Sequence, residues 1–484
     1  MAGVPRALEP VVSAGAAATS AQTPPSPPPA DADRVLAALR KVKGLRIVSR
    51  AASSQVPGAV FYTLGYRQPV DHRKPQGPTF EQKLTLLHRV TADRPTVLFT
   101  SGYYAYDEAF VYEPTALVDG NQLSVEHRYF EPSRPKPADW SKLTIWQSAS
   151  DFHRIVTAFR PLLSGKWIST GASKGGMATV YHRRFFPRDV DGSVAYVAPN
   201  DVDNERDDYV SFVKQAGNDR ACNIALTTLQ RTALQRRTRL VSLLSKAAAK
   251  AGVTFDKTLG SADRAFETTV VDTPFTFWQF GRQKDCATIP GRDATDQQIY
   301  DFIDKKVGWM FYSDANQLAY LPYYYQAASQ LGWPNASDDP DLRGLLRYRE
   351  AGAAPSAVPK SLRPRSFDAK AMRDIDRWVR TQASRILFIY GENDPWSAEP
   401  FQLGATTRDS AVLWVPNGNH GAFLSDLQAP DAQRAVTVLR SWAGVRTDRS
   451  ASTTALSRAR ASVAKIERGT IDQRRLRGGL GRLP

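Results

Sequence analysis

The stretch KWISTGASKGGM, residues 166–177, decides the fold. An apolar strand from Lys166 to Thr170 leads into Gly-Ala-Ser-Lys-Gly, which fits the pattern Gly-X-Ser-X-Gly around Ser173, and a helix is predicted from Gly175 to Phe186. A strand that turns directly into a helix forces the serine into strained backbone geometry, and glycines two positions away on either side avoid collisions with neighbouring elements. We therefore predict a nucleophile elbow with Ser173 at its tip; the alternative is an ordinary glycine-rich turn with a capping serine.

Apolar runs on both sides of this unit predict a doubly wound, mostly parallel sheet. Such runs, too continuous for half-exposed strands, are typical of strands that are buried on both faces. Alternation of strands with helices gives an α/β fold class. The predicted parallel strands are Thr96–Thr100, Gln122–Val125, Ser193–Val197, Arg385–Tyr390 and Val412–Val415, and two earlier strands, Phe61–Tyr66 and Phe80–Arg89, precede them as an antiparallel pair.

Changes in composition and in the hydrophobic pattern divide the chain into five segments. Residues 1–34 read as a signal remnant or a proline-rich linker, and residues 35–202 and 381–445 as two parts of one sheet domain. Residues 203–380 have long helical patterns and aromatic clusters, which predict an inserted helical cap. Residues 446–484 are basic and poor in large apolar side chains, so we expect a disordered tail.

A base and an acid follow the serine in the chain. A serine hydroxyl needs a base within hydrogen-bonding reach, and His420, in the loop PNGNHGAF after a strand, is the best placed of six histidines. Asp394 lies in the loop GENDPW beyond another buried strand, where catalytic groups gather in such sheets, and Glu392 is the less favoured alternative. The order Ser, Asp, His is that of the α/β-hydrolase fold, with Asp394 orienting the imidazole.

An oxyanion hole needs two donors beside the serine. The N–H of Lys174, at the start of the helix, supplies one. The N–H of Tyr103, in the loop that follows the strand at Thr96, is predicted to supply the other, with Gly102 permitting a close approach. Tyr103 and Tyr104 could equally be packing residues at the rim of the site.

Composition limits the partners and cofactors. The formal charge is +16, but ten Lys or Arg against three acids in residues 446–484 give +7 there, and no aromatic residue interleaves with these basic side chains, so we expect no nucleic-acid partner. No run of about 18 apolar residues exists, so no membrane span is expected.

Cys222 and Cys286 stand 64 positions apart without a C-x-x-C motif, so no metal site is expected, and no cofactor. A disulfide is natural in an exported protein, and two free thiols are the alternative.

GASKGG, EHRYF (residues 126–130), GENDPW and NGNHG together resemble the secreted bacterial tripeptidyl aminopeptidases of peptidase family S37, and more distantly the prolyl carboxypeptidase and dipeptidyl peptidase family. The resemblance covers residues 35–445. It implies a serine peptidase with nucleophile Ser173, acid Asp394 and base His420, which releases tripeptides from free N-termini, often after proline, and is exported. Residues 1–23 lack the apolar centre of an export signal, which departs from the family; either the true start lies upstream or this is no signal.

A cap suits an exopeptidase, because a lid restricts access to chain ends and an acidic group can hold the substrate's ammonium. Each acidic candidate is more often an ordinary surface carboxylate, and Trp396 could stack against a proline ring of the substrate or equally belong to the core packing. Rival functions are an esterase or lipase, and a binding protein that kept the fold. The candidates for substrate binding are Glu126, Glu205, Asp207, Asp208, Trp396 and Tyr104.

Overall fold

A nine-stranded sheet forms the centre of the computed structural model, which describes residues 27–202, 208–335, 338–348 and 353–469. Its strand order is β1-β2-β3-β5-β4-β6-β7-β8-β9. The pairs from β5–β4 to β8–β9 are parallel, and β1, β2, β3 and β5 pair antiparallel. The strands are β1 (Leu45–Ala52), β2 (Val60–Pro69), β3 (Thr79–His88), β4 (Thr96–Thr100), β5 (Asn121–Val125), β6 (Trp167–Ala172), β7 (Gly192–Tyr196), β8 (Ile386–Gly391) and β9 (Ala411–Val415).

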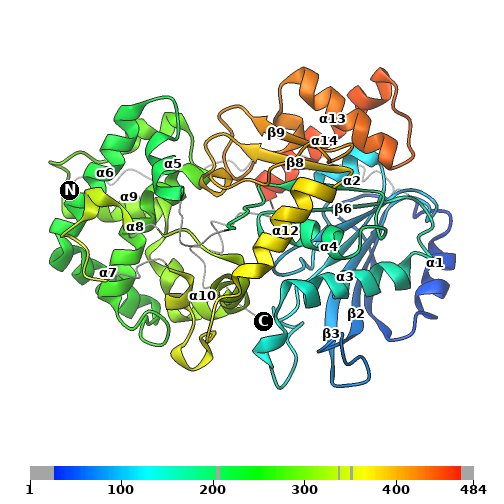
Figure 1. The fold of residues 1–484 in the computed structure, drawn as a ribbon, viewed down its shortest axis with the longest axis horizontal. Helices are drawn as coiled ribbons and strands as arrows, with labels where there is room; N and C mark the ends of the chain where they lie inside the picture. The colour runs from blue at the N-terminus through cyan, green and yellow to red at the C-terminus, as the bar shows by residue number, and fades with distance from the viewer. Residues whose placement is uncertain (1–26, 203–207, 336–337, 349–352, 470–484) are drawn as a thin grey trace, which may run out of the picture.

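Helices cover both faces of the sheet, and the strands of its centre are buried along nearly their whole length (Figure 1). One face carries α1 (Ala32–Leu39), α3 (Ile145–Phe159), α4 (Lys174–Phe185) and α12 (Ala369–Gln382). The other face carries α2 (Glu113–Val118), α13 (Ala429–Trp442) and α14 (Arg449–Gly469).

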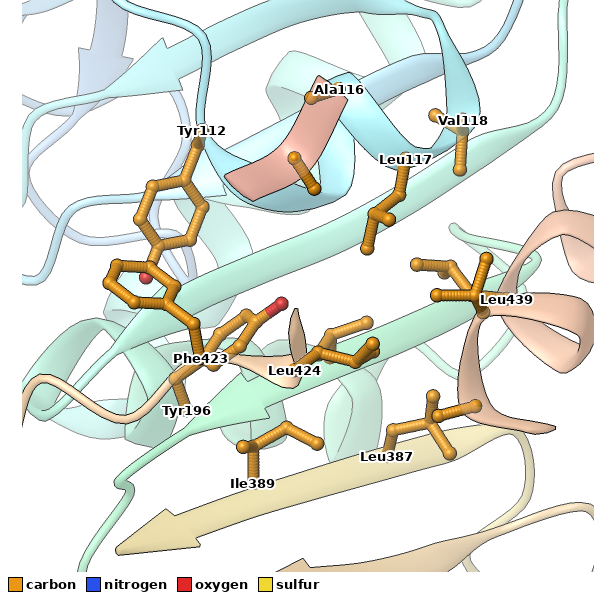
Figure 2. Packing of buried hydrophobic residues seen from close by; sticks show 14 of the residues in the cluster. Tyr112, Ala116, Leu117, Val118, Tyr196, Leu387, Ile389, Phe423, Leu424 and Leu439 are labelled. Atoms are coloured by element: carbon orange, nitrogen blue, oxygen red, sulfur yellow. The ribbon is translucent and has the colours of Figure 1, made fainter. Parts of the chain in front are cut away.

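The core under α2 and α13 is aliphatic along the sheet and aromatic towards one end. Figure 2 shows Leu117 of α2 and Leu439 of α13 on the same side of β8 as Leu387 and Ile389, with aromatic rings gathered beside Tyr196. This arrangement is the α/β-hydrolase fold, which confirms the fold class predicted from the elbow and the strand pattern.

A helical body with its own apolar core is inserted between β7 and α12, and lies to the left of the sheet in Figure 1. Proline at position 274, inside its longest helix, leaves the carbonyl of Val270 without a helical partner, and the buried Gln230 side chain donates to that carbonyl at 3.1 Å. We refer to this body as the cap. Its helices are α5 (Tyr209–Gln215), α6 (Arg220–Gln235), α7 (Arg237–Ala251), α8 (Ala262–Phe280), α9 (Asp296–Lys306), α10 (Asp314–Ala319) and α11 (Leu321–Gln326).

The predicted end of the cap at residue 380 is wrong, because α12 belongs to the sheet domain. Met372, Ile375 and Val379 lie on one face of this helix and pack with Met177 of α4 and Ile386 of β8. The sequence shows only an amphipathic helix and does not reveal which core its apolar stripe faces.

The expectation of a disordered tail is also wrong for α14. Ala455, Leu456, Ala459 and Val463 are buried against the core that contains α2 and α13. Two of these four residues are alanines, which a count of large apolar residues overlooks. Residues 470–484 lie outside the described residues, as do residues 1–26 of the predicted linker.

Cys222 of α6 and Cys286 form a disulfide within the cap, which settles the choice between a bridge and two free thiols. Within the described ranges, the structure has no helix that combines the length and the apolar character needed to cross a membrane.

Candidate active site

The nucleophile elbow lies between β6 and α4. Ser173 has φ 55° and ψ −128°, a strained conformation for a residue with a side chain. Its N–H donates to the Tyr196 carbonyl at 2.9 Å, which ties the turn to β7. A Cβ at Gly175 would lie 2.3 Å from the Thr100 carbonyl oxygen, so only glycine lets α4 start this close to β4. The packing demands the glycines of the motif, and the serine remains partly accessible.

The predicted acid and the predicted base form a hydrogen-bonded pair at the ends of β8 and β9. His420 Nδ1 lies 2.8 Å from Asp394 Oδ2, and the two side chains are 6% and 0% exposed. Asp394 also accepts hydrogen bonds from the Trp396 N–H at 3.1 Å and the Ser397 hydroxyl at 3.2 Å. Because an ionised carboxylate only accepts, the proton of a neutral imidazole lies on Nδ1, and Nε2 is left with a free lone pair. This is the tautomer that a general base requires.

The cap holds the loop that carries the base. The N–H of His420 donates to the Gln279 carbonyl at 3.0 Å, and the Asn419 side chain donates to the Gly281 carbonyl at 3.0 Å. Both acceptors lie at the C-terminal end of α8, which leaves such carbonyls without helical partners. Sequence reasoning missed these anchors, since backbone carbonyls have no signature in the sequence.

The other five histidines are bonded elsewhere. Each has a polar group of the sheet domain within hydrogen-bonding or ion-pair distance of its ring. The pairs are His72 with Asp151, His88 with Asp31, His127 with the Arg128 carbonyl, and both His153 and His182 with Asp189.

The Ser173 side chain faces a tyrosine. Its hydroxyl interacts with the Tyr103 phenol, and within the described part of the chain no hydrogen bond joins it to His420. In enzymes without substrate, catalytic hydrogen bonds are often long and tighten only when substrate binds.

The predicted oxyanion donors lie in the elbow itself and in the loop that contacts it. Lys174 begins α4, and its side chain is only 3% exposed. Its Nζ lies 5.9 Å from the ring centre of Tyr103 and 6.0 Å from that of Phe130, and burial holds the pKa of Lys174 well below its usual value. The amide of Tyr103 donates to the Ser101 hydroxyl at 3.3 Å.

Glu126 does not suit the predicted role of ammonium ligand. It is 1% exposed, and its carboxylate accepts hydrogen bonds from the Ala105 N–H and from the Ser133 N–H and hydroxyl. Burial raises the pKa of Glu126 to about 7, although these hydrogen bonds act in the opposite direction. Its contacts fasten two loops together, a structural role that the sequence did not indicate.

The remainder of the EHRYF segment is also structural. Arg128 is fully buried and donates to both oxygens of Asp151 at 2.7 and 2.8 Å and to the carbonyls of Val70 and Lys142. A bidentate pair with further carbonyl acceptors satisfies a buried guanidinium. This pair fixes the end of β5 beside the elbow.

Three of the other predicted substrate ligands are described. Asp208 is exposed just before α5. Trp396 lies 5.1 Å from Phe275 of the cap and 6.3 Å from His420, between ring centres, so it connects the cap with the base. The Tyr104 hydroxyl donates to the Ala319 carbonyl, which gives Tyr104 a packing role against the cap. Glu205 and Asp207 lie outside the described residues.

Aromatic side chains from the cap close the site on the Tyr103 side. Tyr320 and Tyr323 lie 6.0 and 5.8 Å from Tyr103 between ring centres. The sequence marks them as part of a tyrosine-rich run but does not reveal what the run contacts. Within the described ranges, no three His, Cys, Asp or Glu side chains are grouped as metal ligands would be.

The fold, the elbow and the Asp–His pair define a serine hydrolase of the α/β-hydrolase fold, and comparison with known proteins gives the family. The model of the PS-10 peptidase S37 family matches residues 32–477, so the chain belongs to that family and is a serine peptidase. The prolyl tri/tetrapeptidyl aminopeptidase of Streptomyces mobaraensis is 46% identical over 437 residues, which cover 90% of this chain and 89% of that protein.

Solved structures that resemble the chain are more distant. The proline iminopeptidase of Mycobacterium smegmatis is 15% identical with a TM-score of 0.36, over 78% of this chain and 98% of that one. Potato epoxide hydrolase I is 15% identical with a TM-score of 0.30, over 72% of this chain and 91% of that one.

Proposed function

We propose that this peptidase is an exopeptidase that releases tripeptides from free N-termini, including those that end in proline, through an acyl-enzyme on Ser173. The hydrogen bond between Asp394 and His420, at the rim of the sheet that carries the elbow, is the observation that carries the proposal. The name of the Streptomyces relative, which describes a prolyl tri/tetrapeptidyl aminopeptidase, supports the substrate class.

In the proposed reaction, His420 Nε2 takes the proton of the Ser173 hydroxyl as the serine oxygen attacks the carbonyl carbon. Asp394 stabilises the imidazolium, and donors beside the elbow stabilise the oxyanion. The imidazolium then gives its proton to the leaving amine as the carbon–nitrogen bond breaks. Water, activated by the same base, hydrolyses the acyl-enzyme and frees the tripeptide.

The cap is the proposed cause of exopeptidase action. It covers the site with aromatic side chains, and an acidic group near it would bind the substrate's ammonium. Because Glu126 is occupied, we propose that this group is among Glu205, Asp207 and Asp208, in the segment that leads into α5.

We further propose that the enzyme acts outside the cytoplasm, where the disulfide of the cap would persist. Fractionation of the native host tests this, and a wholly cytoplasmic enzyme would refute it.

The decisive experiment compares a tripeptide p-nitroanilide with its N-acetylated form. We expect release of nitroaniline from the free peptide and at least about a hundredfold lower kcat/KM for the acetylated one, since a lost buried ion pair costs about 3 kcal/mol or more. Equal rates would refute the exopeptidase proposal and favour an esterase. Ser173→Ala should abolish both turnover and fluorophosphonate labelling, and failure of the natural protein to label would point to a binding protein. Mass spectrometry of a digested peptide mixture then gives the length released.

A further inference from the structure

The loop after β4 lies in direct contact with the elbow. Gly102 has φ +75°, and a Cβ there would lie 2.4 Å from the Gly175 nitrogen. The next residue, Tyr103, is therefore held beside Ser173, and its phenol interacts with the serine hydroxyl. The loop therefore brings the Tyr103 side chain to the elbow that carries Ser173.

The backbone of Tyr103 is already occupied. Its N–H donates to the Ser101 hydroxyl at 3.3 Å, and that hydroxyl donates in turn to the Val125 carbonyl at 2.9 Å. Its carbonyl accepts from the His127 N–H at 2.8 Å. These contacts hold the peptide units on both sides of Tyr103 against β5 and the loop itself. The Tyr103 N–H therefore already has a hydrogen-bond acceptor inside its own loop.

The ring of Tyr103, in contrast, is oriented from several sides. Phe130 packs edge-to-face at 5.6 Å between ring centres, and Tyr320 and Tyr323 approach from the cap at 6.0 and 5.8 Å. Lys174 Nζ lies over the ring face at 5.9 Å. Burial raises the pKa of the Tyr103 phenol far above its usual value, so the hydroxyl keeps its proton at every pH where a peptidase works.

From this geometry we propose that the phenolic hydroxyl of Tyr103, and not its amide, is the second oxyanion donor, together with the Lys174 amide. The proposal rests on the proposed function. As the serine oxygen bonds to the carbonyl carbon, the carbonyl's π electrons move onto its oxygen, and the phenol O–H turns from the serine to that oxyanion. The serine proton goes to His420, the phenol keeps its own proton throughout, and the donor is released when the leaving amine departs.

The substitution Tyr103→Phe tests the proposal, because it deletes the hydroxyl and keeps the ring and the amide. We expect kcat per titrated site to fall about 10²- to 10³-fold with KM within about threefold, as on loss of one oxyanion donor. Affinity for a peptide aldehyde, whose adduct with Ser173 carries the oxyanion, should fall in parallel. The matched control Tyr106→Phe alters the same loop at a ring that packs on Phe110, and should keep the natural kcat.

A kcat for Tyr103→Phe within threefold of the natural enzyme would overturn the proposal in favour of the amide. A lower kcat with unchanged aldehyde affinity would overturn it too, since the effect would then not be on the oxyanion. Absence of turnover by the natural enzyme would instead refute the proposed function.

A second variant covers the case in which Tyr103→Phe does not fold. Tetrafluorotyrosine at position 103 keeps the ring but brings the pKa of the phenol down towards the working range. The variant should therefore lose kcat at alkaline pH values where the natural enzyme stays active, and identical alkaline profiles for the two enzymes would overturn the proposal. The titratable groups that face this phenol, Lys174, Tyr320, Tyr323 and Tyr324, are the same in both enzymes.

Discussion

Asp394→Asn is the sharpest test of the proposed triad, because it changes one atom of a fully buried side chain. Asp394 Oδ1 accepts from the Trp396 N–H, and Oδ2 accepts from His420 Nδ1 and from the Ser397 hydroxyl. In the variant, the amide oxygen can keep the Trp396 hydrogen bond, which leaves the amide NH₂ facing His420. The imidazole must then present a bare Nδ1 and carry its proton on Nε2.

An imidazole in that tautomer has no lone pair for the Ser173 proton. Loss of the correct tautomer in a serine triad costs about 10⁴ in kcat, which corresponds to about 5 kcal/mol of transition-state stabilisation. The fold should survive, since the side chain keeps its volume. KM should change little, because Asp394 lies behind His420 and does not face the substrate.

The assay measures kcat on the free tripeptide p-nitroanilide, together with the rate of fluorophosphonate labelling and the thermal midpoint. Glu392→Gln is the matched control, since Glu392 lies in the same loop, is exposed and accepts a hydrogen bond from the Asn417 N–H. The control should retain full activity. If Asp394→Asn keeps more than about a tenth of the natural kcat, Asp394 is not the orienting acid. If Glu392→Gln is the inactive variant, the roles of the two acids were assigned the wrong way round.

Two further predictions concern stability. Burial depresses the pKa of Lys174, so the unfolded chain binds a proton at this side chain more tightly than the folded chain does. The resulting loss of folding stability is largest at low pH and vanishes as the pH approaches about 10.4, the ordinary pKa of lysine. Lys174→Met should therefore raise the thermal midpoint at about pH 7 and raise it less at about pH 10, and a gain independent of pH would contradict this. The disulfide between Cys222 and Cys286 closes a loop of 64 residues, for which chain entropy gives about 4 kcal/mol. The Cys222→Ser/Cys286→Ser double variant should unfold at lower urea, and an unchanged midpoint would show that the bridge adds nothing.

The fold could be predicted largely because its centre obeys local rules. The strands on both sides of Ser173 are buried on both faces and read as continuous apolar runs, and Thr144 caps α3 through the Gln147 N–H as its sequence indicates. The sequence did not predict elements whose position depends on contacts with distant parts of the chain. The strand β1 lies at the sheet edge with most of its residues exposed, so it lacks an apolar pattern.

The site divides in the same way. Residues placed by a turn or by the carboxyl end of a strand, as Asp394 and His420 are, could be found from position along the chain. Glu126 could not be judged, because its carboxylate is consumed by Ser133 and Ala105, and only the folded chain brings these together. The role proposed for the Tyr103 hydroxyl could not be predicted from the sequence either, because the usual donor at that position is an amide and the sequence does not show where a side chain points.

The cap and the catalytic loops behave as one unit in this fold. The loop of the base hydrogen-bonds to the end of α8, and the loop of the acid is held through Asn393, whose side chain accepts from the Gly217 N–H at 2.9 Å. The Tyr103 ring packs on Tyr320, also from the cap. Ser173, in contrast, is held by the sheet domain through the strained turn between β6 and α4. A cap that supplied nothing but a barrier could tilt away and leave the chemistry intact, whereas this one carries contacts to the acid, the base and the proposed oxyanion donor. In the proposed exopeptidase, a substrate that displaces the cap would therefore also displace the groups proposed to cleave it, so that selection of chain ends and activation of the serine would depend on the same hydrogen bonds.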